Sequence, residues 1–195
     1  RSIVVFPTLE SLTSQAAFAP DKKTLIAEQV NDDFIAKTQI PDFLNDPSFK
    51  DLNTRAQFIE DSGLRFLRKY QLEAVRSIQK AVSEGKDRFL FEMATGTGKT
   101  LVSAAVIKLF LRTGNARRVL FLVDRLELED QAAKALRDTL RNDYLTVIYK
   151  ENANDWHHAE IVISTVQTFL SNNRYKRSFK PNDFDLVISD EAHRS

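Results

Sequence analysis

Residues 96–100, Gly-Thr-Gly-Lys-Thr, combine the residue types that bind a phosphate group. Glycine lets the backbone curl so that successive N–H groups point at one anion. The helix predicted to follow adds unpaired N–H groups at its positive end. Lys99 supplies a charge for the outer phosphates, and Thr100 a hydroxyl for magnesium. The full phosphate-loop pattern has a glycine where this chain has Met93, and an ordinary loop is the alternative interpretation of so short a motif.

A second segment ends in two adjacent carboxylates, Asp190 and Glu191, directly after the apolar run 186–189. In a nucleotide hydrolase the first carboxylate holds magnesium, usually through water, and the next accepts a proton from the attacking water. A solvated strand end is the alternative for this pair taken alone. Together with the phosphate loop it predicts an ATP hydrolase with Lys99, Asp190 and Glu191 as catalytic residues. Thr100 and Asp190 are the predicted magnesium ligands.

The elements that must position these residues alternate along the second part of the chain. Continuous apolar runs separated by helical patterns are typical of a parallel sheet covered on both faces. Ligands of such α/β sheets bind at the carboxyl ends of the strands, where both segments above are placed. We predict strands at 89–93, 119–123, 145–149, 161–164 and 186–189, and helices near 70–82, 99–111, 126–140 and 165–170.

Residues 1–63 have a different character and are predicted to form a small helical lead-in. An apolar stripe from Asp21 to Pro41 predicts a helix, and a second helical pattern ends near Gly63. This part holds six Lys/Arg and ten Asp/Glu, whereas residues 64–195 hold 22 and 17. The mildly basic part is therefore the one with the phosphate loop, which is compatible with nucleic-acid binding but does not demonstrate it.

The composition excludes several classes of protein. There is no cysteine among the 195 residues, so neither a disulfide framework nor a thiolate metal site is possible. No apolar run approaches the ~20 residues that span a bilayer, and no signal peptide opens the chain. We expect a cytoplasmic protein. Because the chain starts with Arg1 and stops at Ser195, just after the second motif, we expect it to be a piece of a longer protein.

The two anchor segments resemble motifs I and II of superfamily 2 helicases and translocases. Leu-Arg-Lys-Tyr-Gln at 67–71 is similar to the adenine-recognition segment of that family, Val-Asp-Arg at 123–125 to motif Ia, and Ser-Thr-Val-Gln-Thr at 164–168 to the motif before the second anchor. The resemblance implies a RecA-like fold that binds ATP and Mg²⁺. The implied ATP-binding residues are Gln71, Arg68, Thr95, Gly96, Thr97, Gly98, Lys99 and Thr100. The implied contacts to the nucleic-acid backbone are Arg125, Thr165 and Gln167.

The combination of motifs most resembles the motor (R) subunit of type I restriction enzymes, with type III restriction subunits and defence helicases close behind. This resemblance covers roughly residues 64–195. It implies a first motor domain that couples ATP hydrolysis to movement on double-stranded DNA. The implied partners are specificity and methyltransferase subunits. The second motor domain with its arginine fingers would lie beyond Ser195, so we expect negligible hydrolysis from these residues alone. Another superfamily 2 DNA or RNA helicase, or a non-hydrolysing nucleotide-gated module, are the alternatives.

Three further features favour ordinary structural roles. His157 and His158 with Asp155 and Glu160 suggest a metal site, but a solvated loop is the better interpretation because no geometry-fixing spacing is present. The basic run 174–180 is typical of a solvated loop. His193 is expected to couple the nucleotide site to a neighbouring motif.

Overall fold

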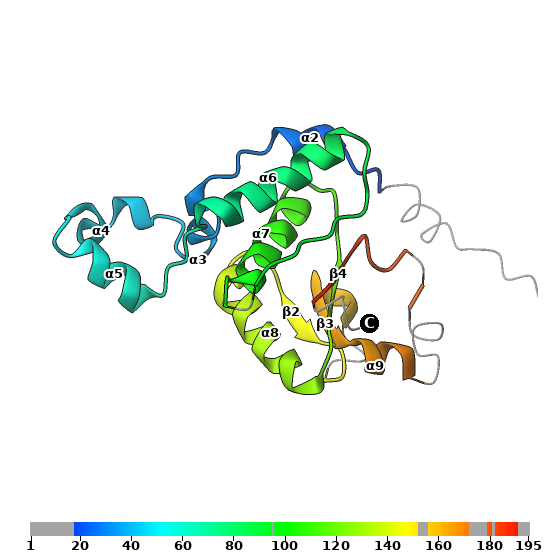
Figure 1. Cartoon of the computed structure of the whole chain (residues 1–195). Coiled ribbons are helices and arrows are strands. Elements are labelled where there is room, and N and C mark those ends of the chain that lie inside the picture. The colour runs from blue at the N-terminus through cyan, green and yellow to red at the C-terminus, as the bar shows by residue number, and fades with distance from the viewer. Residues whose placement is uncertain (1–17, 95, 152–155, 172–178, 181, 191–195) are drawn as a thin grey trace, which may run out of the picture.

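The computed structural model describes residues 18–94, 96–151, 156–171, 179–180 and 182–190, and shows an α/β fold (Figure 1). Its sheet has four strands in the order β2-β3-β1-β4, and every neighbouring pair is parallel. The predicted parallel α/β architecture is therefore confirmed. The strands are β1 (Val119–Val123), β2 (Thr146–Ile148), β3 (Ile161–Thr165) and β4 (Leu186–Ser189).

The apolar strands bury both faces of the sheet because successive side chains point to opposite sides. Val119, Phe121 and Val123 of β1 belong to the larger core, which the helices cover. Leu120 packs on the opposite face in a smaller cluster around the buried Trp156, which lies in a short 3₁₀ turn, Trp156–His158. A strand buried on both faces reads as an unbroken apolar run, which is why the sequence predicted β1 to the residue. The bounds of β4 were also predicted to the residue, although its burial is only partial and Val187 is 56% exposed.

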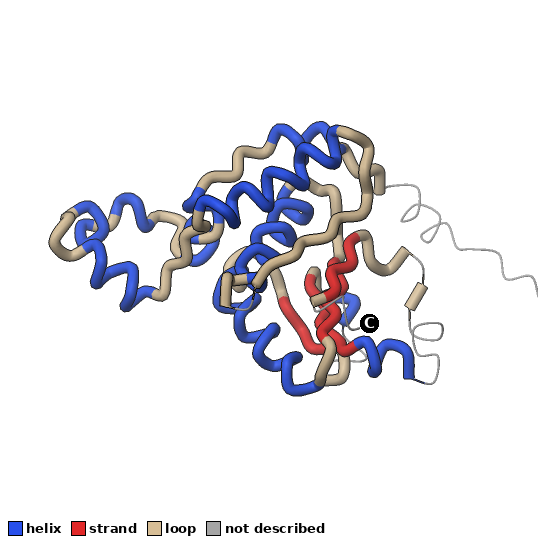
Figure 2. The backbone as a smooth tube through the Cα atoms, in the orientation of Figure 1, coloured by secondary structure: helices blue, strands red, loops and turns tan. Residues whose placement is uncertain are grey.

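Four helices follow the predicted pattern to within one or two residues at each end. Each begins where the apolar periodicity begins, and α8 buries a stripe that includes Ala132, Leu136 and Leu140. Figure 2 shows the helices arranged around the short strands. The helices are α6 (Lys69–Ser83), α7 (Lys99–Arg112), α8 (Leu126–Leu140) and α9 (Val166–Leu170).

The strand predicted at 89–93 is not formed. Residues 86–94 run as an extended loop (Figure 2), and Leu90 is 85% exposed. None of the described strands pairs with this segment. A strand needs a partner to satisfy its backbone N–H and C=O groups, so the apolar run alone does not fix the secondary structure. The phosphate loop therefore follows an extended loop rather than a strand.

The lead-in is helical, as predicted, but the single helix expected from Asp21 to Pro41 is wrong. Its chain leaves the helical conformation at Glu28, and Val30 and Phe34 are buried while Ile26 is 40% exposed. Tertiary packing of Val30 and Phe34 thus overrides the four-residue spacing. The elements are α2 (Lys22–Ala27), a 3₁₀ turn (Asp32–Phe34), α3 (Ala36–Gln39), a second 3₁₀ turn (Phe43–Asn45), α4 (Pro47–Lys50) and α5 (Arg55–Ser62).

The lead-in packs against α6 and α8 and is hydrogen-bonded to α7, while α4 and α5 form an arm that extends away from the sheet (Figure 1). Polar side chains of α6 and α7 donate hydrogen bonds to backbone carbonyls of the lead-in. Gln79 of α6 donates to the Leu25 oxygen at 2.9 Å, and the buried Lys108 of α7 donates to the Phe34 oxygen at 2.5 Å. Because isolated helices this short are not stable in water, their conformation depends on these contacts.

No helix within the described ranges is both long and apolar enough to cross a membrane.

Candidate nucleotide-binding site

The phosphate loop turns through two glycines and leads directly into α7. Gly96 has φ +78° and Gly98 φ +80°, a left-handed conformation that glycine adopts without steric cost. Between them Thr97 closes the turn, since its N–H and its hydroxyl both donate to the Ala94 oxygen, at 3.3 and 2.6 Å. Gly98 is the N-cap of α7, so Lys99 and Thr100 lie in the first turn of a 14-residue helix. The loop therefore has the geometry of an anion site at a helix N-terminus.

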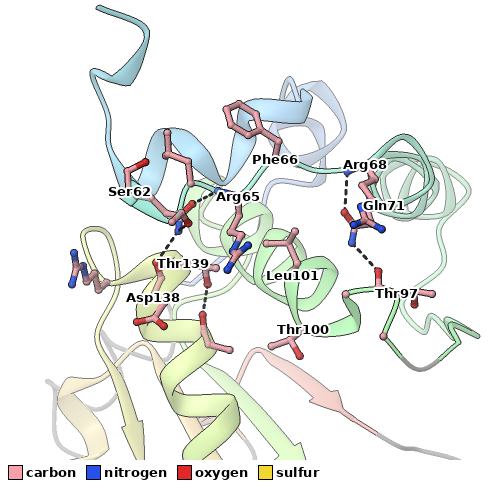
Figure 3. Close-up of a pocket in the computed structure, with 17 residues that line it drawn as sticks. Ser62, Arg65, Phe66, Arg68, Gln71, Thr97, Thr100, Leu101, Asp138 and Thr139 are labelled. Carbon is pink, nitrogen blue, oxygen red and sulfur yellow. Dashed lines mark hydrogen bonds between the residues drawn. The ribbon is translucent and has the colours of Figure 1, made fainter. Parts of the chain in front are cut away.

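Gln71 connects the adenine-recognition segment to the phosphate loop. Its Nε2 donates to the Thr97 oxygen at 2.9 Å, and its Oε1 accepts from the Arg68 backbone N–H at 2.9 Å (Figure 3). Tyr70 donates to the same Thr97 oxygen at 2.7 Å. Both ends of the Gln71 amide are therefore bonded to backbone groups, and the side chain is only 3% exposed.

Gly98 also has a packing role beside Gln71. A Cβ at Gly98 would lie 2.5 Å from the Gln71 Nε2, closer than any van der Waals contact permits. Glycine is therefore favoured at this position by its φ, and a larger residue would also have to displace the end of the Gln71 side chain. At Gly96 nothing lies within 4 Å of the equivalent Cβ, so only the φ requires glycine there.

A cavity of about 640 Å³ opens beside the loop. In Figure 3, Gln71 and Thr97 lie on one side of it, and Asp138 and Thr139 of α8 lie on the other. This size lies within the 300–1,000 Å³ of small-molecule sites. The lining residues are Gln39, Ser62, Gly63, Leu64, Arg65, Phe66, Arg68, Gln71, Gly96, Thr97, Gly98, Thr100, Leu101, Ala135, Asp138, Thr139 and Arg141.

The predicted site carboxylate Asp190 lies at the carboxyl end of β4 and is not among the residues that line the cavity. Asp190 directly follows this strand, and its N–H donates to the Leu122 oxygen of β1 at 2.8 Å. A threonine hydroxyl and an aspartate carboxylate supply the hard oxygen ligands that Mg²⁺ prefers, so Thr100 and Asp190 fit this ion by their chemistry. Glu191, Thr95 and His193 lie outside the described residues.

Two of the three predicted nucleic-acid contacts lie exposed at one edge of the sheet. Val123 and Thr165 are paired on the parallel strands β1 and β3, so Arg125 and Gln167 follow neighbouring strand ends, and both are exposed. Thr165 itself is 1% exposed, and its hydroxyl accepts from the Thr168 N–H at 2.9 Å, which caps α9. Its side chain is therefore used to start a helix.

Glu129 was not singled out from the sequence, although it is a buried carboxylate beside this edge. It is 1% exposed, and its Oε1 accepts from the Thr165 N–H at 2.9 Å. Its Oε2 has no hydrogen bond, and the Lys150 Nζ lies 3.9 Å away. Burial raises the pKa of Glu129 above its usual value. Its position in the sequence could have predicted this burial, because Glu129 lies three residues before Ala132 and so falls on the apolar stripe of α8.

No group of three or more His, Asp or Glu side chains that would suit a metal ion occurs in the described ranges. Asp155, one member of the alternative metal cluster considered from the sequence, lies outside those ranges, as does most of the basic run 174–180.

An all-parallel sheet packed between helices, with a glycine-turned phosphate loop at the start of α7 and Asp190 at the end of a strand, defines a RecA-like P-loop domain. Residues 65–195 match the family described as "Type III restriction enzyme, res subunit", and the chain belongs to this family.

Several curated proteins are similar to most of this chain. The type I restriction enzyme EcoKI endonuclease subunit of Escherichia coli (strain K12) is 36% identical over 149 residues, covering 70% of this chain and 12% of that protein. The EcoAI endonuclease subunit of Escherichia coli is 35% identical over 144 residues, covering 70% and 17%. A putative mitochondrial ATP-dependent helicase, irc3 of Schizosaccharomyces pombe, is 33% identical over 129 residues, covering 65% and 21%. The chain thus spans less than a quarter of the length of each of these relatives, and the resemblance to superfamily 2 motors is confirmed.

Proposed function

We propose that residues 64–195 form the first motor domain of an ATP-dependent DNA translocase of the type I restriction R-subunit kind, and that residues 1–63 form its lead-in. The observation that carries this proposal is the phosphate loop, turned by Gly96 and Gly98 and joined through Thr97 to Gln71. Two relatives named as type I restriction endonuclease subunits support the assignment to this subfamily.

The residues divide the work of ATP hydrolysis between them. The loop amides and Lys99 hold the β- and γ-phosphates, and Gln71 with Arg68 receives the adenine. Thr100 and Asp190 hold Mg²⁺, which neutralises charge on the phosphates when bound. Glu191 orients the attacking water and accepts its proton. Positioning and charge stabilisation of this kind are the main sources of phosphoryl-transfer catalysis.

Double-stranded DNA is the proposed track, and Arg125 and Gln167 are its proposed backbone contacts. Both side chains are exposed at the sheet edge where Asp190 also lies, so nucleotide chemistry and DNA contact share one edge. Phosphate contacts of this kind position a protein on the duplex without reading its sequence. Specificity and methyltransferase subunits are the proposed partners, in the cytoplasm.

ATP hydrolysis by the protein at its full natural length tests this function. We expect hydrolysis to be stimulated by double-stranded DNA more than by RNA, and to be abolished by Lys99→Ala. Lys86→Ala is the matched control, since it removes an exposed lysine whose partner is Glu84. ATP binding without hydrolysis would favour a nucleotide-gated module, and stronger stimulation by RNA would favour an RNA helicase.

The 195 residues alone are proposed to hydrolyse ATP negligibly. An arginine finger from a second domain contributes ~10³–10⁵ in rate, and the resemblance assigns that residue to another domain. Rapid turnover by the isolated chain would contradict this.

A further inference from the structure

The cavity beside the phosphate loop has a far wall that the lead-in holds in place. Gln39, the last residue of α3, makes three hydrogen bonds through its side-chain amide. Its Nε2 donates to the Gly63 oxygen and to the Asp138 oxygen, both at 3.1 Å. Its Oε1 accepts from the Arg65 N–H at 2.7 Å. The Gln39 side chain therefore joins α3 to two other segments, residues 63–65 and the end of α8, and all of them line the cavity.

Two of the three Gln39 bonds go to carbonyls that a helix end leaves without an intrahelical partner. Asp138 lies in the last turn of α8, and Gly63 is the C-cap of α5. The last four carbonyls of a helix have no N–H within the helix to bind. Gln39 thus caps α5 and α8 together, from a position 99 residues before Asp138.

A side chain just after α8 in turn caps the end of α3. Asn142, two residues past the end of α8, donates from Nδ2 to the Thr38 oxygen at 2.9 Å and to the Gln39 oxygen at 2.8 Å. These are carbonyls of the last turn of α3. The two helix ends therefore cap each other, and a shift of either one breaks bonds on both sides.

The segment held by Gln39 carries side chains into the cavity. Arg65 and Phe66 line it, and they follow Gly63 and Leu64 in the chain. The Phe66 ring packs against Phe43, with centroids 5.6 Å apart, and against Phe49 at 6.4 Å. Phe66 is thereby packed against the aromatic core of the arm, while the backbone on its N-terminal side depends on Gln39.

We propose that Gln39 is a positioning residue that sets the nucleotide affinity of this cavity by holding segment 63–66 against the end of α8. The proposal rests on the proposed function, because it takes ATP as the ligand of the cavity. It makes the lead-in part of the nucleotide site, so a partner that displaces α3 weakens nucleotide binding. By linkage, bound nucleotide then stabilises the docked lead-in by the same factor.

Two substitutions test the role of Gln39 in the full-length protein. Gln39→Ala removes all three bonds. Gln39→Glu keeps an acceptor for the Arg65 N–H but places a carboxylate against the Gly63 and Asp138 oxygens. Gln57→Ala is the matched control, because Gln57 donates only to the exposed side chain of Asp61.

The readouts are the Kd of a fluorescent ADP, measured without hydrolysis, and the KM and kcat for ATP. We expect both Gln39 variants to raise Kd and KM about 10-fold, as the loss of a pair of net hydrogen bonds predicts. We expect kcat to change less than about 2-fold, because the residues at the γ-phosphate are not moved. Gln57→Ala should match the wild type.

Unchanged Kd and KM in a folded Gln39 variant would overturn this proposal, as would a fall in kcat with KM unchanged. If Gln39→Ala does not fold, Gln39→Glu decides between these outcomes. If the wild-type protein binds no nucleotide, the proposed function itself is overturned. If the wild type binds nucleotide and the Gln39 variants bind it equally well, only the role of Gln39 is overturned.

Discussion

Gln71 and Thr97, 26 residues apart in the chain, are joined by a hydrogen bond of 2.9 Å from the side-chain amide to the backbone oxygen of the phosphate loop. The bond fixes the loop relative to α6, whose first turn carries Gln71. It also brings the Gln71 amide against Gly98, so the loop conformation and the base-reading segment depend on each other.

Gly98→Ala should therefore lose nucleotide affinity and stability together. The left-handed backbone costs an alanine about 1–2 kcal/mol, and the new methyl group would displace the Gln71 amide from Thr97. Gly85→Ala is the matched control, because Gly85 has φ +82° but nothing within 4 Å of its Cβ. Urea unfolding and ADP binding measure the two effects. Equal destabilisation by both substitutions, with ADP binding intact, would show that the contact with Gln71 has no role.

The buried Lys108 should make stability depend on pH. Burial lowers the pKa of Lys108 from its usual 10.5 to about 8. Below pH 8 both folded and unfolded chains hold the proton, so the cost of burying the charge is fully present. Above pH 8 the folded chain releases it first, so the free energy of unfolding should rise toward pH 10.5.

Urea unfolding between about pH 7.5 and 9.5 isolates this effect of Lys108. Burial raises the pKa of Tyr144 to about 12, so stability should fall again as pH rises above 10. Lys108→Met should remove the rise, whereas Lys37→Met, which removes an exposed ammonium on α3, should keep it. A rise that persists in Lys108→Met would assign the dependence to another group.

Glu129 should tolerate glutamine and not alanine. Because burial raises its pKa, stability falls as pH rises from its usual value of 4.5 through the folded pKa. Glu129→Gln keeps an acceptor for the Thr165 N–H without the charge, so it should be at least as stable as the wild type at pH 7. It should also exceed Glu129→Ala by about 1–3 kcal/mol, since alanine leaves that buried N–H unpaired.

Thermal or urea unfolding of the Glu129 variants across pH 4.5 to 7 measures both effects, with Glu127→Gln on the exposed side of the same turn as control. Loss of stability in Glu129→Gln equal to that in Glu129→Ala would mean that the charge itself stabilises this site.

Arg125→Ala should weaken DNA binding uniformly across sequences. An exposed arginine that contacts one phosphate contributes about one unit to the slope of log affinity against log salt. Lys134→Ala removes the same charge from an exposed position further along α8 and should leave the slope unchanged. Binding of double-stranded DNA by the full-length protein at several salt concentrations checks this. Equal slopes for Arg125→Ala and the wild type would exclude the contact.

Much of the fold could be predicted because its signals are local. The apolar run of β1 and the periodicity of α8 fix these elements almost to the residue. The same reasoning failed at 89–93, where an apolar run has no strand beside it among the described residues. The prediction of one helix through Val30 and Phe34 also failed. These two residues have helical spacing, but both lie beyond the end of α2 and are buried.

The sequence by itself determined the residue types of the site, because glycines, a lysine and a threonine at fixed spacing are a local requirement of phosphate binding. The family match at 65–195 agrees with that prediction. Only the tertiary structure decided that the lead-in forms a wall of the cavity through Gln39, that Glu129 is buried, and that the Thr165 hydroxyl caps a helix. Each of these features depends on backbone N–H and C=O groups that are left without a partner at the end of a helix or strand, and on the side chain that bonds them. No spacing along the chain records that.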